Sequence, residues 1–244
     1  MTRPFEPSII SRLEKIKTAF EEGMLGNTSH EEHPGLPKHS RENYLYFTLA
    51  PALNFQRRSE QLWHAAATTY SDVATSFVFE PYLVCETSDT DLRAALTEHA
   101  LATRPIRHTD TWRRLCGTLV SRYRADPRVF LEACEWDVPK VLGEIEVNKR
   151  LFPMIAGPKM SHYWLFILSR FTDAKFKNIQ AISIIPDIHV RRATVYLGIT
   201  DDAAVSPAER LASIWQLGLE GSGISPSQLH GPLWLWSRAG FPEL

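Results

Sequence analysis

The sequence has few cysteines, and their spacing does not suggest a metal centre. Cys85, Cys116 and Cys134 are far apart in the chain, and none belongs to a C-x-x-C pair. This spacing disfavours a zinc or iron–sulfur site, and it also disfavours a disulfide framework. Reduced, unpaired cysteines are typical of the cytosol, so we expect a cytoplasmic location.

Long apolar runs are missing as well. The run from Tyr163 to Leu168 is far shorter than the about 20 apolar residues that cross a bilayer. The first residues, MTRPFEPSIISRLEKIK, contain no uninterrupted apolar stretch of the kind found in signal peptides. We therefore expect a soluble, monomeric protein with no membrane partner.

The chain also lacks a large excess of either charge, since its net charge is −1. The distribution is uneven: residues 140–192 hold nine Lys and Arg residues against four Asp and Glu residues. That segment carries +5, which leaves −6 on the rest of the chain. The local excess suits a surface that faces phosphate, but it equally suits a solvated helix surface.

Alternating patterns typical of β-strands are scarce, and there is no tandem repeat. Apolar residues instead recur at helical spacing, as in the segment Ser8–Gly23, for which we expect Ser8 as the N-cap and Gly23 as the end. Several later segments have the same pattern, and two begin with Ser-Pro. The sequence predicts an all-α fold, with residues 72–87, rich in Val, Phe and Tyr, as the one candidate for a short strand.

One segment, MIAGPKMSHYWLFIL, places a lysine at the start of a predicted helix. Gly157 allows the backbone to approach a neighbour closely, and Pro158 sets the first helical turn. We therefore expect a helix from Lys159 to about Phe171, whose free first-turn amides can bind a phosphate.

A second helix is predicted to start at Asp187. Pro186 disfavours helix for the residue before it, and Asp187 is a good N-cap. The connection from Thr172 to Pro186 can extend roughly 50 Å. That reach is enough to bring Asp187 beside Lys159.

Together these features resemble the helix–hairpin–helix superfamily of DNA glycosylases. In that superfamily, an apolar-x-Gly-Pro-Lys hairpin marks enzymes that cleave the glycosidic bond and then nick the strand. An aspartate followed by a short helix is the second mark, and IIPDIHVRRATVYLGI is similar to it. The separation of 28 residues between Lys159 and Asp187, and the hairpin sequence IAG, are more like the archaeal 8-oxoguanine DNA glycosylase subgroup.

Two further segments are similar to that subgroup. GISPSQLHGPLWLWSRAG resembles its last helix, and NFQRRSEQLWHAA resembles an early helix. The resemblance runs from about Leu49 to Gly240 and is strongest over residues 151–199 and 224–240. The chain departs from the subgroup at His230, which stands where the family has an aspartate that helps to read the base.

The resemblance implies a two-lobed fold with the active site in the cleft between the lobes. Residues 41–244 would form the glycosylase-like core, with the hairpin and catalytic segment in 140–199. Residues 200–244 would return to pack on the N-terminal lobe. Residues 1–40, a predicted helix and loop, match nothing in the family.

It also implies roles for individual residues. Lys159, as a neutral amine, would attack the sugar C1′ and form a Schiff base, after which β-elimination breaks the strand. We expect Trp164, Phe166 or their neighbours to desolvate this amine. Asp187 would stabilise positive charge on the sugar and handle protons. The damaged base must leave the helical stack, and Trp234 would stack on it, with His230 beside it.

The expected partner is double-stranded DNA that contains a damaged base, such as 8-oxoguanine. Gly157, Pro158, Arg191 and Arg192 are the candidate contacts to phosphate. No organic cofactor is implied, although backbone carbonyls of the hairpin could hold a monovalent metal ion.

Other interpretations remain open. The hairpin could hold phosphate in a non-catalytic DNA-binding module, and the enzyme could act on another lesion or on a free nucleoside. The near-neutral charge keeps the last alternative in view, because tight duplex binders usually carry a larger basic excess.

Overall fold

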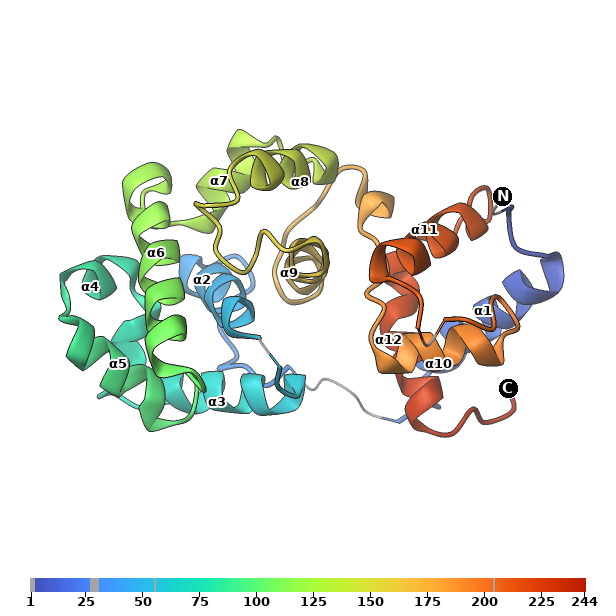
Figure 1. Ribbon diagram of the computed structural model, residues 1–244, viewed down its shortest axis with the longest axis horizontal. Coiled ribbons are helices and arrows are strands. Elements are labelled where there is room, and N and C mark those ends of the chain that lie inside the picture. The colour runs from blue at the N-terminus through green and yellow to red at the C-terminus, as the bar shows by residue number, and fades with distance from the viewer. Residues whose placement is uncertain (1–2, 27–30, 55, 204) are drawn as a thin grey trace. The chain divides into compact units, whose positions relative to one another are not determined.

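The structure is a computed structural model that describes residues 3–26, 31–54, 56–203 and 205–244. Within these ranges every named element is helical, as Figure 1 shows, and one isolated β-bridge joins Asp137 and Lys177. The predicted all-α class is confirmed. No helix in these ranges is long and apolar enough to cross a bilayer.

The chain divides into two compact units. Unit 1 combines both ends of the chain, Met1–Thr28 and Asn178–Leu244, and unit 2 is the continuous segment Ser29–Lys177. The sequence suggested boundaries near residues 40 and 200. The units are described separately below.

Unit 2 contains eight helices among its described residues. They are α2 (Arg41–Leu49), α3 (Ser59–Ser71), α4 (Pro81–Glu86), α5 (Asp89–Glu98), α6 (Pro105–Tyr123), α7 (Pro127–Ala133), α8 (Val138–Val147) and α9 (Pro158–Phe171), with 3-10 turns η1 (Ala50–Leu53) and η2 (Ser76–Phe79). Helix α2 packs on α9, and α6 packs on both α4 and α5 (Figure 1). Large aromatic side chains fill the interior, including the fully buried Trp63, Trp112 and Trp164. Their burial is a main source of stability, since a large aromatic removes 150–250 Å² from water, roughly 25 cal/mol per Å² of apolar surface.

The candidate strand at residues 72–87 is wrong, because this segment forms η2 and α4. Pro81 occupies the first position of α4, where its missing N–H costs nothing. The side chain of Glu80 accepts a hydrogen bond from the Tyr82 amide at 3.3 Å. Val78 and Phe79 are buried in the helical core, so their β-type composition serves packing rather than a sheet.

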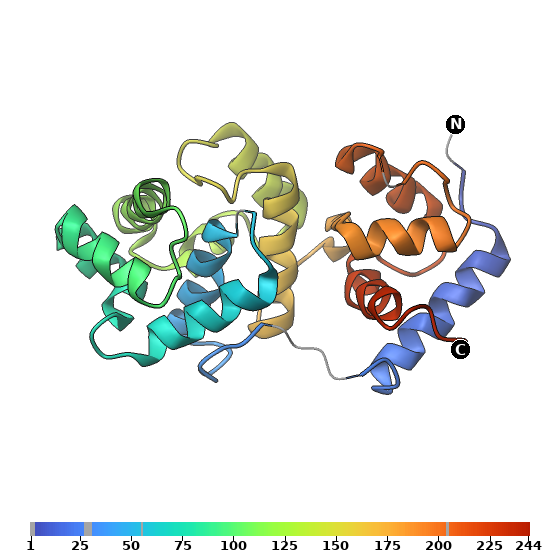
Figure 2. The same cartoon turned by 60° about the horizontal axis from the view of Figure 1, so that its bottom comes forward.

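Unit 1 contains α1 (Pro7–Glu21), η3 (Ile179–Ala181), α10 (Ile188–Tyr196), α11 (Ala208–Gly218) and α12 (Pro226–Arg238). Figure 2 shows α1 beside the C-terminal helices, and α12 packs on both α1 and α10. Leu13 and Ile16 of α1 share one buried cluster with Trp215 and Trp236. Residues from the two ends of the chain therefore form a single core.

The start of α1 differs from the expected one. Its N-cap residue is Glu6 rather than Ser8, because Pro7 takes the first helical position. Gly23, with a φ of 75°, follows the helix as predicted. Near Pro7, the Phe5 amide donates to the Gly218 carbonyl at 2.8 Å. A Cβ at position 218 would lie 2.2 Å from the Phe5 ring, so any larger residue would displace that ring.

Candidate functional site

Helix α9 begins with an end that no side chain caps. Gly157 is the N-cap residue and makes no side-chain cap bond, and Pro158 is the first helical residue. The first backbone bond of the helix runs from the Ser161 amide to the Gly157 carbonyl, at 3.0 Å. The amides of Lys159 and Met160 therefore precede the helical ladder, where they can bind an anion.

A tight turn leads into this helix end. The connection 148–157 joins α8 to α9, and these two helices pack on each other. Within it, the Ala156 amide donates to Phe152 O at 2.9 Å, and the Gly157 amide donates to Met154 O at 3.3 Å. Met154 has a φ of 65°, so the residue that turns the chain is a methionine in the left-handed region. We call residues 148–157 the hairpin segment.

The expected steric role of Gly157 is not found. Its φ is −67°, and a Cβ there would lie 3.5 Å from the Met154 carbonyl oxygen, an ordinary contact. The protein's own packing therefore does not demand glycine. What glycine provides at this position is an N-cap without a side chain.

Lys159 lies exposed in the first turn of α9. Its amine makes no hydrogen bond or ion pair with any of the described residues. Trp164, one of the residues expected to shield this amine, is buried in the core and donates to the Thr48 hydroxyl at 3.1 Å. Shielding by Phe166 or a neighbour stays a prediction. Trp164 and Lys159 therefore occupy different faces of α9.

Tyr163 lies one helical turn after Lys159, and the sequence analysis did not single it out. Its hydroxyl accepts a hydrogen bond from Trp63 Nε1 at 3.0 Å and lies 3.2 Å from Ser59 Oγ. Burial raises the pKa of Tyr163, so the phenol is neutral at physiological pH. The spacing of four residues from Lys159 was the available signal, because it places both residues on one side of the helix.

Two titratable groups lie near Tyr163 in unit 2. Burial lowers the pKa of His162, which favours its neutral form. Burial raises the pKa of Glu31, and the charge of Arg170 opposes that effect. Helix α9 therefore carries a free amine at its start and a polar, poorly hydrated group of side chains farther along.

Asp187 starts α10, as the sequence predicted. Its Oδ1 accepts hydrogen bonds from the amides of His189 and Val190, both at 2.9 Å. Its Oδ2 receives no hydrogen bond from the part of the chain that the structure describes. The side chain is half-buried. One oxygen thus caps the helix, and the other is available for chemistry.

The two arginines of α10 differ in their contacts. Arg191 donates to the backbone carbonyls of Pro186, Ala203 and Ser206, at 3.1, 2.7 and 2.6 Å. It therefore holds the loop after α10 in place. Arg192 is exposed on the helix surface. Both phosphate contacts stay predictions, and the geometry leaves Arg192 the freer of the two.

Helix α12 carries the predicted base-stacking residues. Trp236 is buried in the core, whereas Trp234 is half-buried, so the two indoles face different ways as expected. The Trp234 ring meets the edge of His189 with centroids 5.0 Å apart, and the Arg238 guanidinium carbon lies 5.0 Å from its centroid. His230 is half-buried one turn before Trp234. Burial lowers the pKa of His189.

The predicted site residues therefore form two groups. Unit 2 holds Gly157, Pro158 and Lys159. Unit 1 holds Asp187, Arg191, Arg192, His230 and Trp234. Within unit 1, His189 joins α10 to Trp234 on α12, a connection that involves two segments far apart in the sequence.

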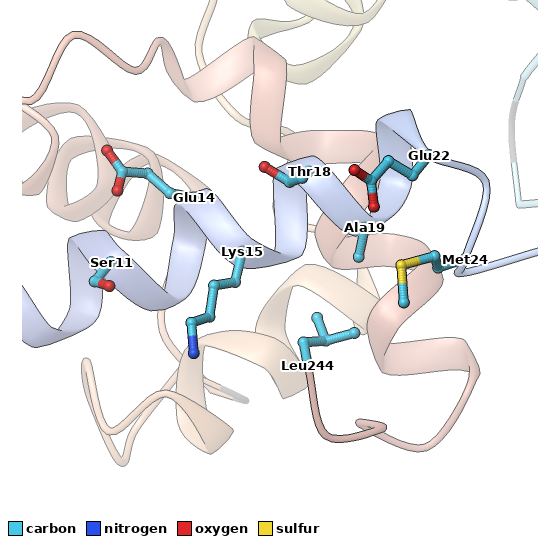
Figure 3. A pocket seen from close by; sticks show the side chains of 8 residues that line it. All are labelled: Ser11, Glu14, Lys15, Thr18, Ala19, Glu22, Met24 and Leu244. Atoms are coloured by element: carbon cyan, nitrogen blue, oxygen red, sulfur yellow. The ribbon is translucent and has the colours of Figure 1, made fainter.

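A hollow of about 340 Å³ lies elsewhere on unit 1, between α1 and the last residue (Figure 3). Glu14, Lys15 and Met24 are among its lining residues, and it contains none of the predicted site residues. In the described ranges, no three His, Cys, Asp or Glu side chains are grouped so that they could bind a metal ion.

No protein-family model matches this chain, and no curated protein matches it significantly. The likeness to the glycosylase superfamily therefore stays a prediction that depends on the residues discussed above.

Proposed function

We propose that the protein is a DNA glycosylase with AP-lyase activity, which removes an oxidised purine such as 8-oxoguanine from duplex DNA. The observation that carries this proposal is the start of α9. There, the amine of Lys159 makes no ion pair with the described residues, and the backbone amides of Lys159 and Met160 precede the helical ladder. A helix end of this kind attracts a DNA phosphate, and a lysine beside it can reach the sugar.

In the proposed reaction, Lys159 supplies the nucleophile. Its neutral amine attacks C1′ as the bond from C1′ to the base breaks, and the base leaves with the bonding electrons and takes up a proton. Opening of the sugar ring gives a Schiff base between Lys159 and C1′. Loss of a proton from C2′ then expels the 3′ phosphate, which cuts the strand.

Asp187 and Trp234 have supporting roles in this proposal. The uncapped oxygen of Asp187 would stabilise positive charge at the sugar and accept a proton. Trp234, which contacts His189 and Arg238, would stack on the displaced base, with His230 beside it. The proposal keeps the two-lobed glycosylase fold that the resemblance implies, with Lys159 in unit 2 and Asp187 in unit 1.

Borohydride trapping tests the proposal. The protein is incubated with duplexes that carry 8-oxoguanine opposite cytosine, an abasic site, or no lesion, and a covalent adduct is sought. We expect an adduct on the 8-oxoguanine duplex that Lys159→Gln abolishes. Lys175→Gln, which removes another exposed lysine of unit 2, is the matched control and should trap normally. An adduct on the abasic duplex alone would support the AP-lyase activity, and it would indicate that the base removed is another lesion or belongs to a nucleoside.

A second candidate is a non-catalytic DNA-binding module, and the exposure of Lys159 favours it. An amine nucleophile generally gains from a water-poor pocket, whereas a lysine that only grips phosphate does not need one. This candidate predicts no adduct on any duplex, together with retained DNA binding.

A further inference from the structure

Helix α6 presents a row of arginines to the surface of unit 2. Arg107 and Arg114 are seven residues apart, so they lie on one face of the helix, and Arg104 is its N-cap residue. All three side chains are exposed. We call Arg104, Arg107 and Arg114 the α6 stripe.

The α6 stripe is continuous with the hairpin segment. The Arg107 guanidinium lies 3.7 Å from Met154 Sδ, and Arg114 donates to the Arg150 carbonyl at 3.1 Å. Arg150 is itself exposed. The positive surface of α6 therefore reaches the segment that leads directly into the start of α9.

The half-buried Arg57 adds to the positive character of the stripe, and the buried His108 lies close to it. Arg57 donates to the carbonyls of Ala100 and Leu101, at 3.1 and 2.9 Å, which fixes the turn between α5 and α6. His108, 3% exposed, accepts a hydrogen bond from the Thr103 amide through Nδ1 at 3.2 Å. The proton of the neutral ring is therefore assigned to Nε2.

Neither buried donor is satisfied at this place. Among the described residues, His108 Nε2 and Arg57 Nε have no hydrogen-bond acceptor. Burial lowers the pKa of His108 to about 4, and the charges of Arg57, Arg104 and Arg107 add to this effect. The charges of these three arginines favour negative charge near the start of α6.

The ion pair of Arg114 does little to cancel its charge. Asp110 lies 3.5 Å from Arg114, but both side chains are at least half-exposed, and such pairs contribute little. Arg104 donates to the neutral Gln56 side chain. Farther along the surface, Glu146 pairs with Lys149 of the hairpin segment.

We propose that the α6 stripe binds the phosphate backbone of duplex DNA beside the hairpin segment. Seven helical residues separate Arg107 from Arg114 by about 10 Å, which matches the rise of about three nucleotides of one strand. The flat guanidinium group also suits phosphate geometry. The inference rests on the proposed function for its choice of DNA, and it adds a contact surface that the sequence did not suggest.

The test measures how affinity depends on salt. Binding of the full-length protein to a duplex with a tetrahydrofuran abasic analogue, which cannot form a Schiff base, is followed by fluorescence anisotropy at several salt concentrations. We expect the double variant Arg107→Gln/Arg114→Gln to lower the slope of log K against log salt by about 2, and to weaken binding roughly tenfold near physiological salt.

The matched control is Arg122→Gln/Arg124→Gln. It removes two exposed arginines at the other end of α6, about 22 Å from Arg107. It should bind within about twofold of the wild type. Equal slopes for the two double variants would overturn the inference. If only the Arg107→Gln/Arg114→Gln variant lowers the slope of log K against log salt, and no duplex gives an adduct, the enzyme proposal fails but DNA binding by the α6 stripe is supported. If adducts form but the slopes are equal, only the surface is wrong.

A second measurement follows His108 directly by NMR. Phosphate beside the α6 stripe would raise the pKa of His108 towards its usual value, and the Arg122→Gln/Arg124→Gln variant should show the same rise. An unchanged His108 pKa at saturating DNA would contradict binding at this place.

Discussion

Helices α9 and α10 both start next to a proline, yet their first turns differ. In α10 the carboxylate of Asp187 accepts two of the free amides, so the protein supplies its own anion. In α9 the N-cap is Gly157, and no side chain takes that place. We call the start of α9 the open end and the start of α10 the closed end. Because a helix start favours negative charge, the open end is suited to bind an external phosphate, whereas the closed end holds the carboxylate of Asp187 in a fixed position.

The buried His108 of unit 2 and the half-buried His189 of unit 1 also differ in their charged neighbours. In both, burial lowers the pKa of the ring. The next contribution at His108 is the positive charge of Arg57, whereas at His189 it is the negative charge of Asp187, which raises the pKa. The start of α6 in unit 2 thus lies in a positive field, whereas the start of α10 in unit 1 carries a negative group, Asp187.

The largest effect should come from removing the charge at the closed end while retaining the cap. In Asp187→Asn, the side-chain oxygen can still accept the two amide bonds, so the free energy of unfolding should change by less than about 0.5 kcal/mol. Loss of the carboxylate should lower the rate of base removal by roughly three orders of magnitude. Single-turnover kinetics on an 8-oxoguanine duplex measures this. A variant as fast as the wild type would exclude Asp187 from catalysis.

The next effect is acid sensitivity due to His108. Its pKa is near 6.5 in the unfolded chain and about 4 in the folded protein, so below pH 6.5 only the unfolded chain gains the proton. Stability should therefore fall as the pH drops from about 6.5 to about 4, by about 3 kcal/mol for this group. Urea unfolding at about pH 7 and about pH 4.5 is compared with that of His108→Gln, which does not titrate. Equal losses in both proteins would refute the assignment.

A smaller effect should follow from opening the closed end. Asp187→Ala removes both cap bonds of α10 and should cost about 1 kcal/mol of stability. Hydrogen exchange should quicken at the amides of His189 and Val190. Comparison with Asp187→Asn separates the cap from the charge. Unchanged exchange at both amides would show that the cap bonds contribute little.

The smallest effect should come from closing the open end. Gly157→Ser gives α9 a side-chain acceptor, and a Cβ at this position meets only ordinary contacts. Stability should rise by a few tenths of a kcal/mol, about the difference between Ser and Gly caps. The hydroxyl would compete with phosphate for the amides, so DNA affinity should fall roughly threefold. Anisotropy titration measures it, and tighter binding would contradict an anion site at this helix end.

Local signals in the sequence sufficed for the helix starts. Pro158 and Asp187 act within one turn of their own positions, so they could be recognised without tertiary information. The opposite faces of Trp234 and Trp236 also followed from the helical repeat. At α1, two local signals competed, and Pro7 prevailed over Ser8 as the determinant of the first turn.

Features that depend on distant partners were not accessible in this way. The hydrogen-bond partner of the Trp164 indole is Thr48, which lies 116 residues earlier and which no local pattern indicates. Arg191 is held by carbonyls of a loop whose path no local pattern indicates. Likewise, the α6 stripe forms one surface with the hairpin segment only because α6 lies against that segment in the fold.

The construction of unit 1 from both chain ends has a consequence for biosynthesis. On the ribosome, α1 emerges before its partners α10 and α12, which lie beyond residue 187. Translation proceeds at about 5–20 residues per second, so the apolar face with Leu13 and Ile16 stays without its packing partners for on the order of 10–40 s. Unit 2 is complete well before then. Nascent chains should therefore offer α1 to chaperones throughout this interval, and slow translation of the last third should lengthen that exposure.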